Sequence, residues 1–537
     1  MTSMDQTVET ETDLPDLSRT KLAVLLGSIL IVALCGIVYE LIIGTVSSYL
    51  LGNSVYQFSL TIGFFMFAMG VGSHVSRYLG RNLLQTFIYV EIALAIIGGL
   101  CSVTLFMLFP LAPWLYTAAM FGFIFMIGGL VGVEIPLLMR ILAARQGTRN
   151  SIADVLSLDY IGALIGSVAF PLLLLPSLGL ITSSFAIGLI NVFVAFLNAI
   201  WLREHIPNPR RMISLSVGVL VGLIVLILTA SRITAYAQHH LYFDQIVWQK
   251  QTNYQTLVVT NAWPNNDLRL FIDGHLQFSE QDEHRYHEAL VHPALSWRVT
   301  PAATAPQHIL VLGGGDGMAV REILKHKAIE SIDLVDLDPE MTWLGKDFEP
   351  VARLNENALS DPRVTLINQD AFNFVRDSEK TYDRIILDFP DPHNEAISKL
   401  YSEEFYALVY ARLSDDGVAV SQSSSPYFAR RTYWSIGATL QTIFPEVTSY
   451  NITIPAFGIW GFHMATKSRG GALGELPDGL ALLSEDVFAA AQVFPCDISR
   501  PDEFVSSNSI FDPSLYEAYT QDLAKSPVVL MENCRSA

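Results

Sequence analysis

Seven continuous apolar stretches dominate the first 231 residues of the chain. They run roughly over residues 22–44, 56–78, 84–109, 112–141, 158–178, 181–202 and 212–231. A helix needs about 20 residues to cross a bilayer, and each stretch has that length. A polar, acidic leader over residues 1–21 precedes the first stretch, and no small-residue cleavage site follows it. We therefore expect a retained helix and not a secretory signal peptide. The pattern predicts a multi-pass α-helical membrane domain of about seven helices over residues 22–231.

The loops between these stretches differ in charge. Basic residues gather before the first stretch and after the second, fourth and sixth: Arg19, Lys21, Arg77, Arg81, Arg140, Arg145, Arg149, Arg203, Arg210 and Arg211. The intervening loops over residues 45–55, around 110 and around 180 carry no charge. Because positively charged loops remain on the cytoplasmic side, we expect a protein of the cell (inner) membrane with a cytoplasmic N-terminus.

A few acidic residues interrupt the apolar stretches: Glu40, Glu91, Glu134 and Asp159. Ionisable side chains inside a membrane are costly and commonly mark function. Glu134 and Asp159 lie near the arginine-rich loop, so we expect them to pair with Arg140 or Arg145. Glu40 has no basic residue near it in the sequence and stays unassigned.

The pattern changes after residue 232 to short alternating segments. Residues 255–260 and 268–272 predict strands, and Asp273-Gly274 predicts a hairpin turn between strands. Further on, apolar strand runs alternate with helical segments, with strands predicted at 308–312, 331–336, 363–367, 383–388 and 418–422. This alternation predicts a doubly wound, Rossmann-like α/β domain whose ligand lies at the carboxyl ends of the strands. We expect a β-rich segment over residues 232–305 and the α/β domain over residues 306–537.

Composition separates the same two parts. Hydrophobic residues make up 51% of the chain and charged residues 16%, whereas soluble proteins carry about 25% charge. Residues 22–231 hold eight Arg and six acidic residues, and residues 232–537 hold 23 basic and 41 acidic residues. The net charge of −19 argues against nucleic acid as a partner, because nucleic-acid binders need basic faces.

Four cysteines are too few for a disulfide framework. Cys35 and Cys101 lie in apolar stretches and are expected to be core residues. Cys496 and Cys534 lie in the acidic part. They are either unpaired core thiols or, if that part faces an oxidising compartment, a bridge.

A glycine-rich turn over residues 313–317 follows the first strand of the α/β pattern. Such a turn lets a nucleotide, a dinucleotide or an S-adenosyl ligand approach the backbone closely. Asp336 ends the next strand, where a carboxylate can accept hydrogen bonds from ribose hydroxyls, and Asp370-Ala371 follows the third strand, where an adenine amino group could bind. Asp316 in the turn would repel a pyrophosphate and attract a cationic ligand, which disfavours NAD and FAD. The alternative for Asp316 is a helix N-cap.

Several spaced motifs, in one order over roughly residues 245–465, resemble the spermidine synthase (polyamine aminopropyltransferase) family. They are Tyr254-Gln255, residues 270–283, Tyr286-His287-Glu288, His292-Pro293, residues 311–317 followed by 321–326, residues 361–364, residues 382–388 and Asp391-Pro392. Apolar stretches ahead of such a domain resemble the membrane-bound bacterial branch. The resemblance implies a Rossmann-like domain of the S-adenosylmethionine-dependent methyltransferase type with a small N-terminal β segment.

The resemblance also implies a reaction, in which an amine takes the aminopropyl group of decarboxylated S-adenosylmethionine. Putrescine is the default acceptor, giving spermidine and methylthioadenosine. Polyamines are ammonium ions at pH 7, so a general base must remove a proton before attack. No prosthetic group and no metal is implied. The expected partners are small polyamine and nucleoside ligands, the lipid bilayer and, because the family is often dimeric, a second copy of the chain.

Residue roles follow from the same resemblance. Asp388 would be the general base, and Asp391 would bind the amine end of the acceptor. Tyr286 and His287 would line the amine site, and Asp316 would hold the aminopropyl ammonium. The nucleoside would be held by Gln255, Gly313, Gly315, Asp336, Asp370 and Ala371. Gln422, at a strand end, is a weaker polar candidate.

Departures from the family pattern lie on the acceptor side. Phe389-Pro390 replaces a small polar pair between the two acids, and His393-Asn394-Glu395 replaces a Gly-Pro. Phe457 stands where the family has a tyrosine. Asp282 and Glu283 are interpreted as solvated acids at a helix start and are left out of the site.

Two other functions stay open. One is a transporter or membrane sensor whose α/β domain binds a nucleoside or polyamine without turnover, and the other is an S-adenosylmethionine-dependent methyltransferase. The side of the membrane is also open. Seven crossings place residue 232 outside, and the uncharged segment 212–231 favours that placement, whereas decarboxylated S-adenosylmethionine is expected in the cytoplasm.

Overall fold

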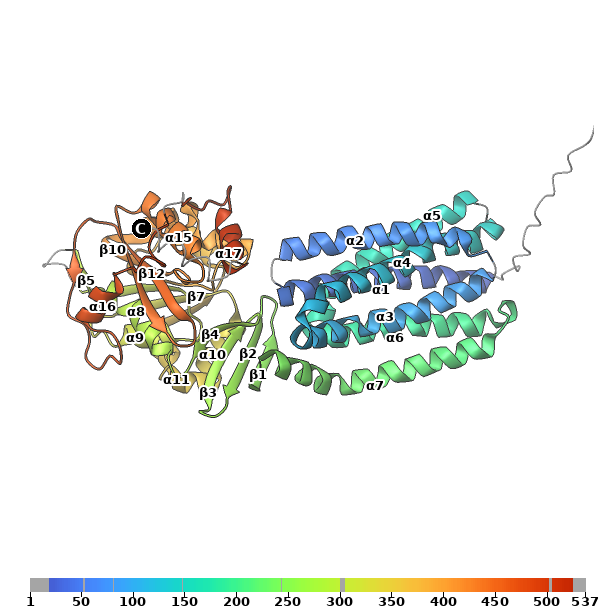
Figure 1. Cartoon of the computed structure of the whole chain (residues 1–537), viewed down its shortest axis with the longest axis horizontal. Helices are drawn as coiled ribbons and strands as arrows, with labels where there is room; N and C mark the ends of the chain where they lie inside the picture. Colours follow the sequence, from blue (N-terminus) through green and yellow to red (C-terminus); the bar gives the residue numbers. More distant parts are fainter. Residues whose placement is uncertain are drawn as a thin grey trace, which may run out of the picture. The chain divides into compact units, whose positions relative to one another are not determined.

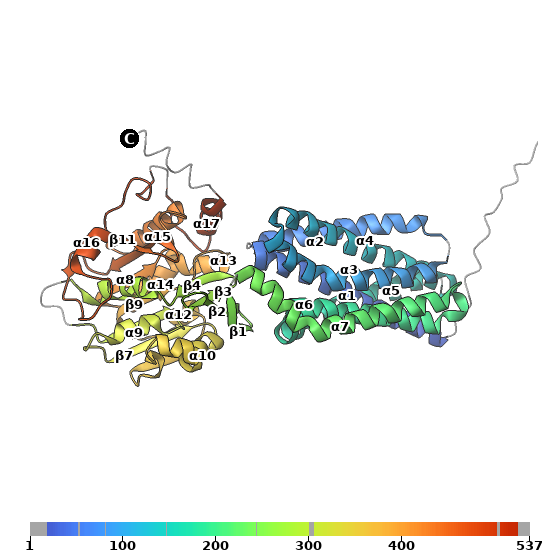
Figure 2. The same cartoon turned by 60° about the horizontal axis from the view of Figure 1, so that its bottom comes forward.

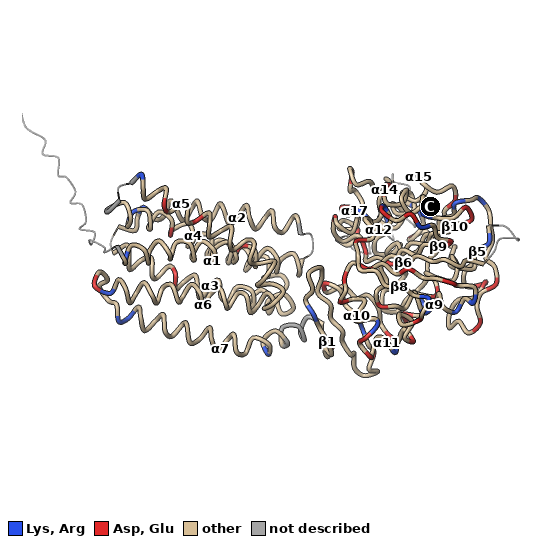
Figure 3. Tube along the Cα trace, turned by 180° about the vertical axis from the view of Figure 1, so that it is seen from behind, with Lys and Arg blue, Asp and Glu red and all other residues tan. Residues whose placement is uncertain are grey.

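The computed structural model describes residues 19–51, 54–80, 82–146, 148–242, 244–299, 305–501 and 505–524. The chain divides into two compact units, Met1–Phe243 and Asp244–Ala537 (Figure 1). Charged residues are sparse along the helices of the first unit and numerous over the second (Figure 3). The units divide at 243/244 and not at the predicted 231/232, because the last helix of the first unit continues to Tyr242 after its apolar stretch has ended.

Most described residues of the first unit are helical. Its long helices are α1 (Arg19–Leu51), α2 (Ser54–Val75), α3 (Leu83–Leu111), α4 (Pro113–Gln146), α5 (Thr148–Ala169), α6 (Leu175–Trp201) and α7 (Pro209–Tyr242), with short turns η1 (Ser76–Tyr78), η2 (Phe170–Leu174) and η3 (Arg203–His205). Among the described residues, 6 helical stretches are long and apolar enough to cross a membrane. The longest, Arg149–Trp201, contains two of the predicted segments. They are separated at Gly179, whose φ of 71° and ψ of 178° lie outside the helical region.

These helices pack side by side. In both cartoon views α2 lies beside α4, and contacts also join α1 to α5 and α3 to α6 (Figures 1 and 2). The buried core includes Cys35 and Cys101, which are free thiols as expected. Large apolar side chains also point outward, among them Met66, Leu164, Leu172 and Leu228. Helices that are apolar on both their inner and outer faces are typical of membrane spans.

The buried acids of this unit are arranged differently from the expectation. Arg140 donates to the backbone carbonyls of Ser76 and Leu79, at 3.1 and 2.9 Å, instead of pairing with an acid. Within the part of the chain that the structure describes, no hydrogen-bond donor reaches the carboxyl oxygens of Glu134 or Glu91. The side chain of Arg145 lies outside the described residues. The expected pairing of Glu134 with Arg140 is therefore wrong.

The second unit begins with a four-stranded antiparallel sheet in the order β1-β2-β3-β4. The strands are β1 (Gln245–Gln251), β2 (Thr256–Ala262), β3 (Asp267–Ile272) and β4 (His275–Ser279). The turn between β3 and β4 is the predicted Asp273-Gly274, with φ of 48° and 83°. Positive φ at both turn residues suits the twist of a tight hairpin.

The main sheet has seven strands in the order β11-β12-β10-β9-β6-β7-β8. Its strands are β6 (His308–Gly313), β7 (Ser331–Asp336), β8 (Val364–Asn368), β9 (Tyr382–Asp388), β10 (Leu413–Gln422), β11 (Glu446–Ile454) and β12 (Gly458–Thr466). The five strands from β8 to β10 are parallel, and β12 and β11 add an antiparallel edge. The side chains of residues 309–312 on β6 are fully buried. Burial on both faces is why a central parallel strand reads as a continuous apolar run.

Helices connect and cover these strands. They are α8 (Glu283–Ser296), α9 (Met318–Leu324), α10 (Pro339–Asp347), α11 (Glu349–Leu354), α12 (Ala371–Asp377), α13 (Glu395–Ser398), α14 (Glu403–Arg412), α15 (Arg430–Ile443), α16 (Glu485–Ala491) and α17 (Ser514–Ala524); the turns η4 (Ala358–Ser360) and η5 (Lys399–Tyr401) and a small sheet of β5 (Trp297–Arg298) and β13 (Ala472–Leu473) complete the unit. The predicted fold class, apolar helices followed by a Rossmann-like α/β domain with a small β segment, is confirmed.

The strand order fixes where a ligand can bind. From β6 the chain adds β7 and β8 on one side, and then returns to add β9 and β10 on the other. The connections diverge between β6 and β9, and such a switch point opens a crevice at the carboxyl ends of the strands. Gly313 and Asp388, the last residues of these two strands, are paired in register there.

Candidate active site

The glycine-rich turn brings the backbone directly against Asp388. Gly313 and Gly314 have φ of 83° and 65°, a region that favours glycine. A Cβ on Gly313 would lie 2.1 Å from the backbone oxygen of Asp388, and one on Gly314 would lie 3.0 Å from Oδ2 of the same residue. The turn therefore needs glycine for both its conformation and its closeness to β9.

Asp336, at the end of β7, is held by the same turn. Its Oδ2 accepts from the backbone N–H of Gly315 at 3.1 Å, and its Oδ1 accepts from that of Asp338 at 2.9 Å. Gln255 reaches this region by donating to Oδ2 of Asp338 at 3.1 Å. Burial raises the pKa of Asp336 to about 7. The carboxyl group thus changes charge near neutrality.

Asp370 and Ala371 follow β8, the next strand in the sheet. Asp370 caps α12 by accepting from the backbone N–H of Asn373 at 2.9 Å, and its Oδ2 pairs with Lys399 at 3.0 Å. The strand end is tied to its neighbour, because the N–H of Gln369 donates to the backbone oxygen of Asp336 at 3.1 Å. Asp370 is thus placed on the expected edge, with its carboxylate engaged by a cap and a lysine.

Asp388 ends β9 and meets the helix α8. The hydroxyl of Tyr286 donates to its Oδ1 at 2.6 Å. Burial and the charge of Asp316 raise the pKa of Asp388, the nearby His287 and the Tyr286 hydrogen bond lower it, and the net value is about 6. A buried carboxylate with a pKa just below neutrality suits a general base at pH 7.

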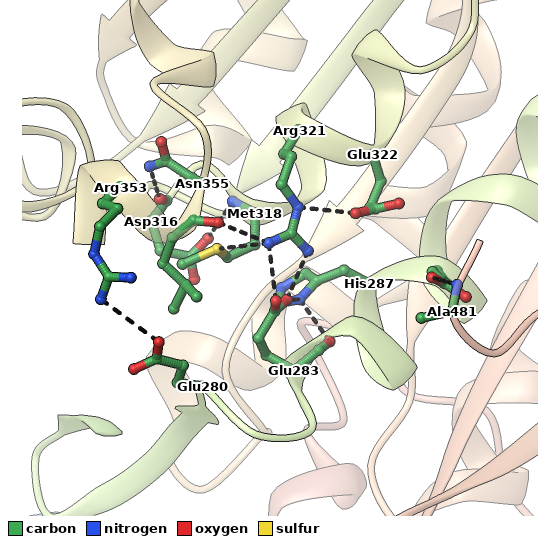
Figure 4. A network of polar contacts seen from close by, with 12 residues as sticks. Glu280, Glu283, His287, Asp316, Met318, Arg321, Glu322, Arg353, Asn355 and Ala481 are labelled. Atoms are coloured by element: carbon green, nitrogen blue, oxygen red, sulfur yellow. Dashed lines mark hydrogen bonds and ion pairs between the residues drawn. The ribbon is translucent and has the colours of Figure 1, made fainter. Parts of the chain in front are cut away.

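Asp316 lies inside the glycine turn and is 8% exposed. Its Oδ1 accepts from the backbone N–H of Met318 at the start of α9, at 2.9 Å (Figure 4). The N-cap residue of α9 is Gly317, so this contact is not the N-cap that was the alternative interpretation of Asp316, and the charge of Asp316 interacts with that of His287. Burial raises the pKa of Asp316.

Asp391 is surrounded by hydroxyl and amide donors. Its Oδ2 accepts from Ser424 at 3.2 Å and from Tyr519 at 3.0 Å, and its Oδ1 accepts from Gln422 at 3.4 Å. Burial raises its pKa to about 6. The polar side chains that contact Asp391 in the described structure, Tyr519, Ser424 and Gln422, are all neutral.

Known proteins resemble both the α/β domain and the whole chain. The family model of the spermine/spermidine synthase domain matches residues 283–472. A polyamine aminopropyltransferase of Leptospira interrogans is 43% identical over 88% of this chain and 93% of its own length. Polyamine aminopropyltransferase 1 of Streptomyces coelicolor is 40% identical over 93% of this chain and 94% of its own length. This chain belongs to the polyamine aminopropyltransferase family.

A crystal structure of spermidine synthase from Thermotoga maritima is also similar, with 24% identity and a TM-score of 0.41 over 47% of this chain and 85% of that one. The whole-chain relatives confirm the predicted family and the prediction that the protein is an enzyme. In this aminopropyltransferase, Gly313, Asp336 and Asp388 end strands of the main sheet, whereas Gln255 directly precedes β2 of the four-stranded sheet and Tyr286 and His287 lie on α8.

The two phenylalanines that depart from the family pattern pack against other aromatic rings. Phe389 is buried against Tyr401 and Phe405, with ring centroids 6.3 and 5.9 Å apart. Phe457 packs on Trp460 at 5.1 Å. The spacer between Asp388 and Asp391 is therefore anchored in the apolar core of the aminopropyltransferase.

Three functional neighbours of the acids escaped sequence reasoning. Tyr519 and Ser424 donate to Asp391, and Tyr401 receives a hydrogen bond from Gln422 at 2.6 Å. Tyr519 lies 128 positions after Asp391, on α17. No local motif marks it, so only the folded chain reveals the contact. Glu283, which the sequence predicts to be a solvated acid outside the site, is also buried.

Proposed function

We propose that this enzyme transfers the aminopropyl group of decarboxylated S-adenosylmethionine to a diamine, with putrescine as the preferred acceptor. One observation carries the proposal: the buried carboxyl of Asp388, with a pKa of about 6, lies at the switch point beside the glycine turn. This carboxylate can take a proton from an ammonium ion and, being anionic, also attracts the cationic substrates.

The chemistry follows from these groups. The acceptor ammonium gives a proton to Asp388 and becomes a neutral amine. Its nitrogen then forms a bond to the aminopropyl carbon as the carbon–sulfur bond breaks. The electron pair of that bond stays with sulfur, so the sulfonium becomes the neutral thioether of methylthioadenosine. Tyr286, hydrogen-bonded to Asp388 at 2.6 Å, keeps the carboxylate aimed at the acceptor.

The nucleoside part is assigned to the other strand ends. Asp336 would accept the ribose hydroxyls, and the backbone of Gly313 and Gly315 allows close approach of the ligand. Gln255, Asp370 and Ala371 would complete this side, with Asp316 near the aminopropyl ammonium. Each oxygen of Asp370 already has one donor, Asn373 N–H or Lys399, so an adenine amino group would bind to Asp370 as an additional donor.

The second buried acid, Asp391, supports putrescine as the amine acceptor. Asp391 follows Asp388 by three positions and has its own set of neutral donors and no basic partner among described residues. A diammonium ion has two charges, of which one would lose its proton to Asp388 while the other stays paired with Asp391. His287 and Tyr286 would line the space between them.

The test is a turnover assay on the purified full chain in detergent. We expect methylthioadenosine and spermidine from decarboxylated S-adenosylmethionine and putrescine. Methyl transfer from S-adenosylmethionine at a similar rate would instead establish a methyltransferase. Tight binding of both ligands without any product would support a transporter or sensor.

We propose that the protein is a multi-pass protein of the inner membrane with a cytoplasmic N-terminus. The basic loops support this orientation, and the stretch Pro209–Thr234 is long and apolar enough for a last crossing.

The state of Cys496 bears on the side of the membrane that the second unit faces. Cys496 is disulfide-bonded, which favours an oxidising compartment for the second unit. Cys534 lies outside the described residues, so its pairing stays a prediction. A reporter fused after Ala537 tests the side: alkaline phosphatase activity supports the outside, and fluorescence of a cytoplasm-only reporter contradicts it.

A further inference from the structure

Glu283 is buried in the second unit and is not the solvated acid that the sequence suggested. Its side chain is 4% exposed, and both carboxylate oxygens are bonded by Arg321, at 2.8 and 2.9 Å (Figure 4). The prediction of a solvated Glu283 was wrong because a residue at the start of a helix is exposed only if no other element covers it. Here α9 covers Glu283 through Arg321.

The same carboxylate holds His287. Nδ1 of the imidazole lies 2.8 Å from Oε2 of Glu283 and 2.9 Å from its backbone oxygen. Both of these atoms can only accept a hydrogen bond when the acid is ionised, so Nδ1 must carry a proton. The ring therefore has a fixed orientation, and its other nitrogen is turned away from Glu283.

Arg321 in turn is anchored from behind. Its Nε donates to Oε1 of Glu322 at 2.9 Å, and its Nη1 donates to the backbone oxygen of Leu354 at 2.8 Å. Glu322 also binds His292 at 2.8 Å and Lys325 at 2.6 Å. The Glu283 carboxylate is thus held by a guanidinium that is itself fixed on several sides.

This geometry sets the charge of His287. Burial alone would lower the pKa of His287, but the hydrogen bond and charge of Glu283 raise it to about 8. Burial would raise the pKa of Glu283, but His287 and Arg321 lower it to about 2. At neutral pH the pair is therefore an imidazolium beside a carboxylate.

We propose that Glu283, clamped by Arg321, is a positioning residue for the transfer reaction: it holds His287 as the imidazolium that keeps the buried acids Asp316 and Asp388 ionised. The inference rests on the proposed base role of Asp388. It adds a residue that touches neither substrate nor reacting atoms and acts through His287.

The charged and titratable groups that the structure describes around His287 come from several elements. Glu283 and Tyr286 come from its own helix, Arg321 from α9, Asp316 from the glycine turn and Asp388 from β9. The charge of His287 lowers the pKa of both Asp316 and Asp388. Among these groups, the carboxylate of Glu283 accepts the hydrogen bond from Nδ1 of His287, so its negative charge stabilises the protonated imidazole.

The test is the pH dependence of kcat/KM in Glu283→Gln. The amide keeps the shape but removes the charge, so His287 loses its proton more easily and Asp388 becomes harder to ionise. We expect the acidic limb of the profile to move to higher pH by about one unit, the effect of one nearby opposite charge. Activity should therefore fall at pH 6 to 7 and recover near pH 8.

Glu322→Gln is the matched control. It removes an acid that also contacts Arg321 and is equally buried, but it has no contact with His287. We expect its acidic limb to stay at the wild-type position, even if its melting temperature falls. Equal shifts in the two variants, or no shift in Glu283→Gln, would overturn the proposal.

A second variant, His287→Asn, can be measured even if Glu283→Gln does not fold, and an unmoved acidic limb in His287→Asn would overturn the proposal; the double variant applies where Glu283→Gln folds. His287→Asn removes the imidazolium directly and should move the acidic limb in the same direction, with no further shift when Glu283→Gln is added. A full shift in the double variant beyond that of His287→Asn would contradict the relay. An acidic limb that persists in Asp388→Asn would contradict the base role of Asp388. If Asp388→Asn abolishes the limb but Glu283→Gln leaves the limb at its wild-type position, the base role stands and only the positioning role of Glu283 is contradicted.

Discussion

The α-carbon of Gly313 lies so close to Asp388 that a single added carbon would collide with the neighbouring backbone. The calculated separation between a Cβ on Gly313 and the Asp388 oxygen is 2.1 Å, far below van der Waals contact. The glycine that begins the ligand-binding turn therefore also determines how the proposed base is placed. In the proposed function, nucleoside binding and proton removal would therefore depend on the same stretch of backbone.

Gly313→Ala should lower both stability and activity. The substitution adds a clash with β9 to a positive φ of 83°, and we expect a loss of about 2 kcal/mol or more in the free energy of unfolding. Gly274→Ala is the matched control, since Gly274 has the same φ of 83° but nothing within 4 Å of its Cβ position. Denaturant unfolding of the two variants should show the larger loss at Gly313. Equal losses would mean that strain alone, and not closeness to Asp388, requires the glycine.

Asp388→Asn should reduce kcat by about 10²- to 10⁴-fold while methylthioadenosine still binds. The amide fills the same space and can still accept from Tyr286, but it cannot take the amine proton. Steady-state kinetics and calorimetric titration would separate the two effects. Asp361→Asn, which removes an acid paired with Arg363 on the surface, is the control and should leave kcat unchanged. An Asp388→Asn enzyme with near-wild-type kcat would remove this residue from the base role.

Binding of methylthioadenosine should weaken on acidification. In the proposed function, ribose hydroxyls would donate to the ionised form of Asp336, whose burial raises its pKa to about 7. The fraction of ionised carboxyl falls as the pH drops through that value, so Kd should rise about tenfold between pH 8 and pH 6. Calorimetry at several pH values measures this change. Asp336→Asn should bind more weakly and show no such pH dependence; a parallel pH dependence in that variant would assign the effect to another group.

Tyr519→Phe should impair the amine acceptor selectively. The change removes the hydroxyl that donates to Asp391 at 3.0 Å and leaves the rest of the ring in place. We expect KM for putrescine to rise about tenfold, the size of a lost hydrogen bond to a charged group, with KM for the nucleoside substrate unchanged. Tyr516→Phe on the same helix is the control, since its hydroxyl has no contact with Asp391 in the described structure. Parallel changes in both KM values would indicate a general loss of structure.

Local pattern was sufficient for the five parallel strands of the main sheet and for the strand ends that carry the acids, whereas the antiparallel edge strands β11 and β12 were not predicted. Asp336 and Asp388 could be placed because the strand-turn-helix pattern fixes where a parallel strand ends, and ligands bind at those ends. The hairpin at Asp273 likewise follows from two turn residues. By contrast, the end of α7 was placed too early, because a helix can continue as a polar segment after its apolar stretch has stopped.

The sequence by itself determined the class of the chain, the membrane-type helices, the Rossmann-like domain and the residues of its glycine turn, since each of these depends on short-range spacing. Only the tertiary structure decided which distant side chains complete the site. Tyr519 reaches Asp391 across 128 positions, and Glu283 meets Arg321 across 38. Burial is a property of the packed elements, so a carboxylate that looks solvated in sequence can become a fixed ion pair once α8 and α9 pack together. The pKa values that matter for proton removal arise from that packing.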